Sequence, residues 1–352
     1  MDLQQRINAF VKLGEFLSQF SNEGIKKKEG IANNDLFYEG FLQQIKLAQE
    51  YNGWFTKENV LFSLNSWSKA LNKSNITAWL DKYNFNTVQS KKVAIIMAGN
   101  IPLVGFHDFI SVLLSGHKVI VKLSSNDKHL LPYLTKYLEV LEPDFKGTIE
   151  FTSDRLYDFD AVIATGSDNT ARYFEHYFKN KPSIIRKNRN SVAVLTGNET
   201  SEELKMLSED IFRYYGLGCR NVSKLFVPKD YNFQRFFEAM YHWDPIINQA
   251  KYANNYDYNK AVYLMSEFDM LENGFLMIKE DESYSSPIAT VFYEFYEDIN
   301  QLHQKLETDK DRIQCVVANG IMNSEVQFGS TQQPQLWDYA DDVDTIAFLL
   351  KI

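Results

Sequence analysis

Apolar residues in the first part of the chain recur at three- and four-residue steps. The pattern runs from Leu3 to Phe20, returns in Phe37–Ala48 and appears again in Val60–Leu71. Such spacing puts the apolar side chains on one face of a helix, and Thr56 is a suitable N-cap for the third segment. We therefore expect an N-terminal helical region that extends to about Tyr83, with its aromatic side chains in the core.

The pattern changes at Val93, where short continuous apolar runs replace the helical spacing. Runs of this kind are typical of strands that are buried on both faces. Amphipathic segments separate them, and one, PLVGFHDFISVLLSG, ends at Gly116, a natural helix stop. This alternation predicts a parallel sheet with crossover helices, an architecture of the nucleotide-binding type. The predicted strands are VAIIMA (93–98), HKVIVKL (117–123), GTIEFTS (147–153), DAVIATG (160–166) and SVAVLTG (191–197).

The second half of the chain continues the alternation and predicts a second α/β domain. Helical patterns cover 201–215 and 233–243, and strand-like patterns cover 224–228 and 287–295. The pattern, rather than any linker composition, places the boundary near Asn190. We expect residues 1–190 to hold the N-terminal helices and a dinucleotide-binding domain, 191–325 to form the catalytic domain, and 326–352 to be a C-terminal segment.

Composition excludes several classes of protein. The 352 residues are 45% hydrophobic, enough for a buried core, and carry a net charge of −9, which argues against nucleic-acid binding. Only two cysteines occur, so no disulfide framework is implied and a reducing compartment is favoured. The sequence has no signal-peptide pattern and no apolar stretch long enough to span a membrane. We expect a cytoplasmic protein.

Cys219 is the first candidate for chemistry. It lies in Gly216-Leu217-Gly218-Cys219-Arg220, between a predicted helix and a predicted strand. The glycines permit a sharp turn with room beside the sulfur, and the neighbouring arginine is able to stabilise a thiolate. A cysteine of this kind is more often a small buried hydrophobe than a nucleophile, so the pattern leaves both roles open. Cys315, in the apolar run RIQCVVAN, is predicted to be structural.

Other candidates follow the predicted strands. Asn100 comes after the first strand, where its amide is placed either to donate to developing negative charge or to cap the next helix. Lys122 ends the second strand, where it meets either a nucleotide or only solvent. Gly166 and Ser167 follow a later strand and resemble a turn that binds pyrophosphate, although the chain has no GxGxxG fingerprint. We identify no metal site.

The order and spacing of these segments resemble the aldehyde dehydrogenase superfamily. The sequence carries AGNIPLVG, SGHKVIVKLS, IATGS, SVAVLTG and GLGCRN in that order. Within the superfamily it is most similar to the acyl-CoA reductases that include the long-chain fatty acyl reductase of bacterial bioluminescence. The resemblance extends from about Val93 to Pro228, and FGSTQQPQLWDYADDVDT is similar to that family's closing segment. It implies an aldehyde dehydrogenase-like α/β fold.

The resemblance also implies roles for individual residues. It makes Cys219 the nucleophile, and it makes Asn100 the donor to the oxyanion together with the backbone N–H of Cys219. Lys122 matches the family's adenosine-ribose lysine, and Gly166 and Ser167 match its cofactor-phosphate turn.

Three positions depart from the pattern of the wider superfamily. Ser125 stands where many NAD-using relatives carry a glutamate for the ribose hydroxyls, so NADPH is the expected cofactor and NADH the second choice. Ile185, or Arg186 if the alignment shifts by one, stands where hydrolytic members carry their general-base glutamate. Ser283 stands about where a nicotinamide-ribose glutamate is found, and we assign it no role.

The resemblance thus implies an NADP-dependent acyl-CoA reductase of fatty acid metabolism that forms a thioester on Cys219. An acyl phosphate in place of the acyl-CoA or acyl-carrier thioester, and a non-catalytic acyl-binding subunit of a larger complex, are the alternatives. The superfamily's habit implies a homo-oligomer. Acyl chain length and carrier are not specified by the sequence.

Overall fold

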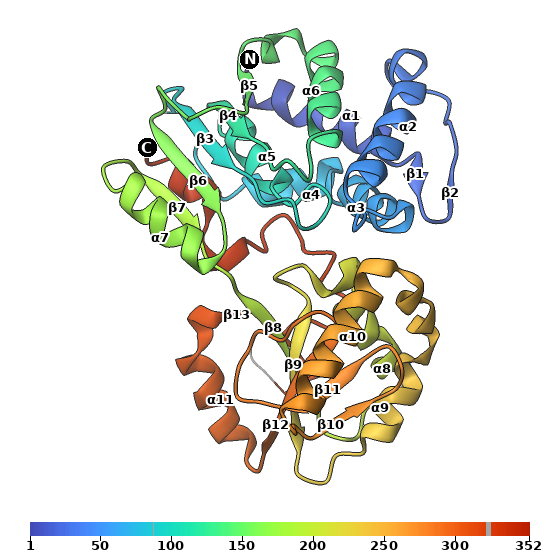
Figure 1. Cartoon of the computed structure of the whole chain (residues 1–352). Coiled ribbons are helices and arrows are strands. Elements are labelled where there is room, and N and C mark those ends of the chain that lie inside the picture. The colour runs from blue at the N-terminus through green and yellow to red at the C-terminus, as the bar shows by residue number, and fades with distance from the viewer. Residues whose placement is uncertain (87, 322–324) are drawn as a thin grey trace. The chain divides into compact units, whose positions relative to one another are not determined.

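The computed structural model describes residues 1–86, 88–321 and 325–352. These residues divide into two compact units, each with its own sheet (Figure 1). Unit 1 comprises Met1–Lys187 together with Gln335–Ile352, and unit 2 comprises Asn188–Pro334.

The N-terminal helices of unit 1 confirm the predicted helical region. They are α1 (Leu3–Leu17), α2 (Asn34–Tyr51), α3 (Lys57–Ala70) and α4 (Lys73–Leu80). Thr56 caps α3 by accepting a hydrogen bond from the Asn59 amide at 3.4 Å. A short hairpin, β1 (Phe20–Ser21) with β2 (Gly24–Ile25), separates α1 from α2 and was not predicted.

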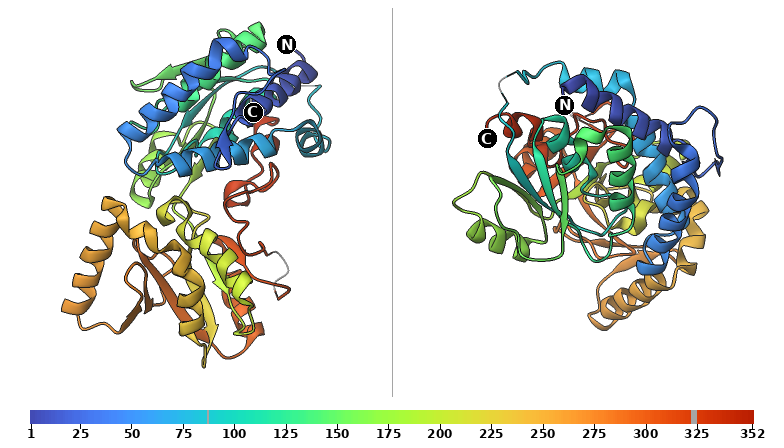
Figure 2. Two further views of the ribbon diagram at one scale, coloured as in Figure 1. Left: turned by 90° about the vertical axis from the view of Figure 1, so that its right-hand side faces the viewer. Right: turned by 90° about the horizontal axis from the view of Figure 1, so that it is seen from above.

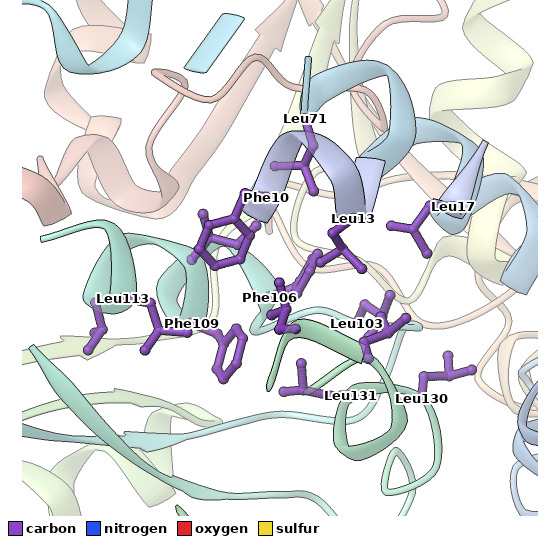
Figure 3. Close-up of a cluster of buried hydrophobic side chains, with 14 of the residues drawn as sticks. Phe10, Leu13, Leu17, Leu71, Leu103, Phe106, Phe109, Leu113, Leu130 and Leu131 are labelled. Atoms are coloured by element: carbon purple, nitrogen blue, oxygen red, sulfur yellow. The ribbon is translucent and has the colours of Figure 1, made fainter. Parts of the chain in front are cut away.

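These helices pack on the rest of unit 1 through apolar side chains. In Figure 3, Phe10 and Leu13 of α1 lie beside Phe106 and Phe109. The indole of Trp79 is fully buried, as predicted for a core aromatic residue. Burial of apolar area at roughly 25 cal/mol per Å² is the main stabilising term for such a contact. The helical region is therefore part of the core of unit 1.

The sheet of unit 1 has five parallel strands in the order β5-β4-β3-β6-β7. Helices α5 (Phe106–Leu114), α6 (Leu130–Leu141) and α7 (Asp168–Tyr177) connect them. The centres of β3, β4 and β6 are buried on both faces, which explains their continuous apolar sequences. The strands are β3 (Lys92–Ile96), β4 (Lys118–Lys122), β5 (Ile149–Thr152), β6 (Ala161–Thr165) and β7 (Ser183–Arg186).

Unit 2 is built on a six-stranded sheet in the order β10-β11-β12-β9-β8-β13, with β10 antiparallel to β11. Helices α8 (Ser201–Phe212), α9 (Phe233–Met240), α10 (Ala250–Met265) and α11 (Ile299–Thr308) accompany this sheet. The strands are β8 (Asn190–Val194), β9 (Val222–Pro228), β10 (Met270–Glu272), β11 (Met277–Glu280), β12 (Thr290–Tyr296) and β13 (Ile313–Val317). Both sheets are mainly parallel and accompanied by helices, which confirms the predicted α/β fold.

Within the predicted C-terminal segment, Gln335–Ile352 returns to unit 1 (red in Figures 1 and 2), whereas the residues before it belong to unit 2. Its helix α12 (Thr345–Leu349) contacts α5. The indole N–H of Trp79 donates to the Tyr339 hydroxyl at 2.7 Å, and the Tyr83 hydroxyl donates to Asp344 at 2.6 Å. The His117 ring bonds the Leu349 carbonyl at 2.8 Å. The two ends of the chain therefore share one core.

Candidate active site

Three neighbouring strands of unit 1 end at the same edge of the sheet. Ile96, near the end of β3, is in register with Lys122 of β4 and with Ala164 of β6. Ligands of open α/β sheets bind at the carboxyl ends of the strands, so this edge is where a bound molecule is expected. The structure gathers five predicted residues there: Asn100 after β3, Lys122 and Ser125 at and after β4, and Gly166 and Ser167 after β6.

The loop that carries Asn100 is held by side chains far away in the sequence. The Ser63 hydroxyl donates to the Pro102 carbonyl at 3.0 Å. The side-chain Nδ2 of Asn52 donates to the Gly99 carbonyl at 3.4 Å and to the Asn126 carbonyl at 3.4 Å. These hydrogen bonds connect the loops after β3 and β4. Such bonds fix the backbone on both sides of the half-buried Asn100.

Asp127 is a third support of this loop. Its buried carboxylate accepts a hydrogen bond from the Leu103 amide at 2.8 Å, where Leu103 adopts a left-handed φ of 58°. Burial raises the pKa of Asp127 to about 6, and the bond from Leu103 opposes the rise. The left-handed residue also delays the helix, so α5 begins at Phe106 and not at the predicted Pro102.

The predicted cofactor residues after β4 are accessible. The ammonium group of Lys122 donates to the Asp154 carbonyl at 3.1 Å, beyond the end of β5. The side chain of Ser125 is exposed in the turn that follows β4. An exposed hydroxyl at this position presents no negative charge to a ligand.

Gly166 and Ser167 form the start of α7. The Ser167 hydroxyl accepts from the Thr170 amide at 3.4 Å, which makes Ser167 the N-cap. A Cβ atom at Gly166 would lie 3.0 Å from Thr170, so the glycine lets the helix approach the strand closely. A helix N-terminus at the carboxyl edge of a sheet offers backbone N–H groups to an anion.

Neither residue at the position expected for a hydrolytic base is able to take a proton. Ile185 is half-buried in β7, in register with Ala164. Arg186, the next residue, forms a buried ion pair with Asp108 of α5, and its guanidinium also donates to the Thr345 hydroxyl at 3.2 Å. A guanidinium stays protonated in proteins, so Arg186 holds α5 and α12 to β7.

Cys219 lies in a tight turn of unit 2. The backbone N–H of Asn221 donates to the Gly218 carbonyl at 3.0 Å. Cys219 and Arg220 therefore occupy the two central positions of a β-turn. The Ser191 hydroxyl donates to the Cys219 carbonyl at 3.1 Å. The side chain of Cys219 is exposed. The turn thus presents an accessible thiol on a fixed backbone.

The backbone before this turn is strained. Helix α8 ends at Phe212, three residues before the end of the predicted helix. Tyr214 and Tyr215 have left-handed φ values of 56° and 61°, and Gly216 follows at 74°. Left-handed conformations cost an L-residue about 1 to 2 kcal/mol each. The left-handed conformations of Tyr214 and Tyr215 end the helix, although the helical pattern of the sequence continues to Tyr215.

The guanidinium of Arg220 contacts the second cysteine. Its Nη1 donates to the Cys315 sulfur at 3.2 Å, so Arg220 links the Cys219 turn to β13. Cys315 is buried in that strand, as its apolar sequence predicted.

The six predicted site residues therefore lie in two units. Five are on the carboxyl edge of unit 1, and Cys219 is in unit 2. Within the described ranges, no group of three or more His, Cys, Asp or Glu side chains is arranged to hold a metal ion. No helix in the same ranges is long and apolar enough to span a membrane.

Several solved aldehyde dehydrogenases share this fold. Aldehyde dehydrogenase 21 from Physcomitrella patens, in complex with the reaction product succinate, is 12% identical with a TM-score of 0.62, covering 90% of this chain and 73% of its own. Aldehyde dehydrogenase C of Pseudomonas syringae, a mutant in complex with NAD+ and octanal, is 11% identical with a TM-score of 0.62, covering 91% and 73%. A Bacillus cereus aldehyde dehydrogenase, in complex with NAD+, is 13% identical with a TM-score of 0.61, covering 90% and 72%. The predicted aldehyde dehydrogenase-like fold is confirmed.

The family follows from the sequence comparison. The family model described as Acyl-CoA reductase (LuxC) matches residues 19–240, and the chain belongs to this family. The match begins among the N-terminal helices, well before the Val93 at which the resemblance in the motifs begins. No curated protein matches the chain. Family and fold together support an oxidoreductase that acts on aldehyde or acyl groups.

Proposed function

We propose that the chain reduces an acyl-CoA, or another acyl thioester, to the aldehyde with NADPH, by way of an acyl group bound to Cys219. Membership in the acyl-CoA reductase family supports the reaction, and the exposed thiol on its fixed turn is the observation that carries the site. Unit 1 is then the cofactor-binding domain and unit 2 the catalytic domain.

In the first step, the Cys219 sulfur attacks the carbonyl carbon of the thioester. A new C–S bond forms and the carbonyl electrons move to oxygen, giving a tetrahedral oxyanion. Asn100 donates to this oxyanion in the proposed mechanism, together with the Cys219 backbone N–H. When the oxyanion collapses, the bond to the carrier sulfur breaks and the carrier leaves as the thiol, with the proton that Cys219 gave up. The acyl group remains on Cys219.

In the second step, the acyl-enzyme gains a hydride and a proton, and the Cys219 sulfur leaves. The nicotinamide cofactor supplies this hydride when bound. Asn100 again donates to the carbonyl oxygen as negative charge develops there. The aldehyde is released when the C–S bond to Cys219 breaks. Cys219 recovers its proton and is ready for another acyl group.

The carboxyl edge of unit 1 fits a dinucleotide. Ser167 and the N-terminus of α7 offer donors for the pyrophosphate, and Lys122 offers a cation for the adenosine ribose. The exposed Ser125 brings no carboxylate that would repel a 2′-phosphate, which favours NADPH. Aldehyde dehydrogenases of the same fold have been crystallised with NAD+, and this supports a nicotinamide cofactor.

The residues at the proposed base position favour reduction over hydrolysis. Positioned proton transfer contributes roughly 10²- to 10⁴-fold to a reaction, and Ile185 and Arg186 are unable to supply it to water. The acyl group on Cys219 therefore survives until hydride or a thiol reaches it. Oxidation of an aldehyde in the reverse direction should require CoA or another acceptor thiol.

Three measurements test the proposal. Incubation with acyl-CoAs of increasing chain length should add the mass of the acyl group to the intact protein, and Cys219→Ser should abolish the addition while Cys315→Ser keeps it. NADPH oxidation should follow the same series of substrates. Reduction of acyl phosphates alone would favour that alternative substrate, and acylation without any NADPH or NADH oxidation would favour a non-catalytic subunit. Rapid carboxylic acid formation from aldehyde without thiol would contradict the proposal.

A further inference from the structure

The side-chain amide of Asn221 is buried beneath the Cys219 turn. Asn221 is 2% exposed and directly precedes β9. Its Oδ1 accepts a hydrogen bond from the Gly218 amide at 2.8 Å. The backbone N–H of Asn221 also donates to the Gly218 carbonyl. Two hydrogen bonds between Gly218 and Asn221 therefore close the turn that contains Cys219.

The other end of the same amide reaches the end of α8. The Asn221 Nδ2 donates to the carbonyls of Asp210 at 2.9 Å, Arg213 at 2.9 Å and Ile211 at 3.3 Å. Carbonyls in the last turn of a helix have no partner within the helix and need one from elsewhere. One side chain thus satisfies the helix end and at the same time holds the turn of the nucleophile.

The strained residues lie between these two attachment points. Tyr214 and Tyr215 are left-handed, and such conformations persist only where the surroundings hold them. Asn221 contacts the chain immediately before them, at Arg213, and after them, at Gly218. Its four side-chain hydrogen bonds therefore fix the positions of both ends of the short segment between α8 and the turn.

We infer that Asn221 is the positioning residue for Cys219: through Gly218 it holds the sulfur in the orientation from which it attacks the acyl carbon. This inference rests on the proposed function, because it takes Cys219 as the nucleophile. Attack on a carbonyl requires a close and oriented approach, and a displacement of about 1 Å in a reacting group can cost roughly 100-fold in rate. Alkylation by a small reagent in solution needs only an accessible thiol.

The test compares these two reactions of the same sulfur. In Asn221→Ala, the rate of Cys219 acylation by acyl-CoA and the turnover should fall between about 10- and 100-fold, the scale of a misplaced reacting group. The KM for acyl-CoA and the affinity for NADPH should stay within about twofold, because a change of orientation leaves ground-state binding intact. Alkylation of Cys219 by iodoacetamide, followed by peptide mass spectrometry, should change far less than acylation.

Cys315 distinguishes positioning from a general loss of structure. It is buried, so its alkylation reports opening of the unit. If Asn221 only stabilised the fold, the alanine variant would expose Cys315, and the loss of acylation would match the unfolded fraction. That result would overturn the inference, and so would acylation of the alanine variant at the rate of the parent protein. Should the alanine variant not fold, Asn221→Ser takes its place under the same criteria.

Asn259→Ala is the matched control. Asn259 is also a buried asparagine of unit 2, and its amide donates to the Ile288 carbonyl at 2.9 Å. Its loss should lower the melting temperature without changing the ratio of acylation to alkylation at Cys219. Cys219→Ser separates the two proposals. An active serine variant would reject Cys219 as the nucleophile and hence the proposed function. An inactive serine variant, together with a fully active Asn221→Ala, would reject only the positioning role of Asn221.

Discussion

Arg186 at the end of β7 and Asp108 in α5 form an ion pair in the interior of unit 1, with side chains 8% and 6% exposed. Removing one partner leaves an uncompensated buried charge, which typically costs 3 to 5 kcal/mol. Asp108→Asn should therefore lower the free energy of unfolding by about 3 kcal/mol or more in urea titrations. The double variant Asp108→Leu with Arg186→Met should recover most of this loss. A single variant within about 1 kcal/mol of the parent would show that Arg186 finds another partner.

Asn100 provides a test of the oxyanion role. Asn100→Ala should lower turnover by roughly 100-fold or more, the effect of losing one oxyanion donor. Cofactor affinity should hardly change, because the support of the loop by Ser63, Asn52 and Asp127 does not involve the Asn100 side chain. Steady-state kinetics with a fluorescence titration of NADPH separate the two effects, and the exposed Asn84→Ala is the control. Normal turnover would return Asn100 to a purely structural role.

Cofactor preference depends on the charge at position 125. Ser125→Glu should weaken NADPH binding roughly fivefold, the effect of about 1 kcal/mol of repulsion between exposed charges. Binding of NADH should be unchanged or stronger. Lys122→Ala should weaken both cofactors more than it slows the chemistry. Titration of the three proteins with both cofactors decides the matter, and a parent enzyme that prefers NADH would refute the argument from Ser125.

Asp127 makes stability depend on pH. Its pKa is raised from 3.8 to about 6 in the folded protein, so the folded state binds the proton more tightly than the unfolded state. This contribution to stability is full below about pH 4 and is lost as pH rises through 6, by up to about 3 kcal/mol. Asp127→Asn removes the carboxylate, and the difference in stability from the parent should then change between pH 4 and 7. Urea titrations across this range measure it. The exposed Asp81→Asn is the control variant.

The sequence predicted the strands of unit 1 well because buried parallel strands are continuous apolar runs. VAII and VIV leave few alternatives once helical segments flank them. Two errors in the bounds of helices fall where the backbone conformation departs from periodicity. Leu103 and Tyr214 adopt left-handed φ values that no apolar pattern records, so the start of α5 and the end of α8 were misplaced.

The supports of the site were harder to predict than the site residues. Asn52 reaches the Gly99 carbonyl across 47 positions of the chain, and Ser63 reaches Pro102 across 39. Local spacing holds no information about such pairs. Asn221 is different, because an asparagine between a glycine-rich turn and a strand is a typical turn residue. That signal is present in GLGCRN, next to the cysteine and the arginine.

The return of the C-terminal segment to unit 1 has a consequence for biosynthesis. A ribosome releases the N-terminal part first, but the hydrogen bonds of Trp79 and His117 form only after Tyr339 and Leu349 have been synthesised. Unit 2, Asn188–Pro334, is made in between, which takes on the order of 10 to 30 s at ~5–20 residues per second. Domains generally fold as units during synthesis, and all of unit 2 has been made before Tyr339 and Leu349 become available to unit 1. The residues that complete the core of unit 1 are therefore translated after all of unit 2.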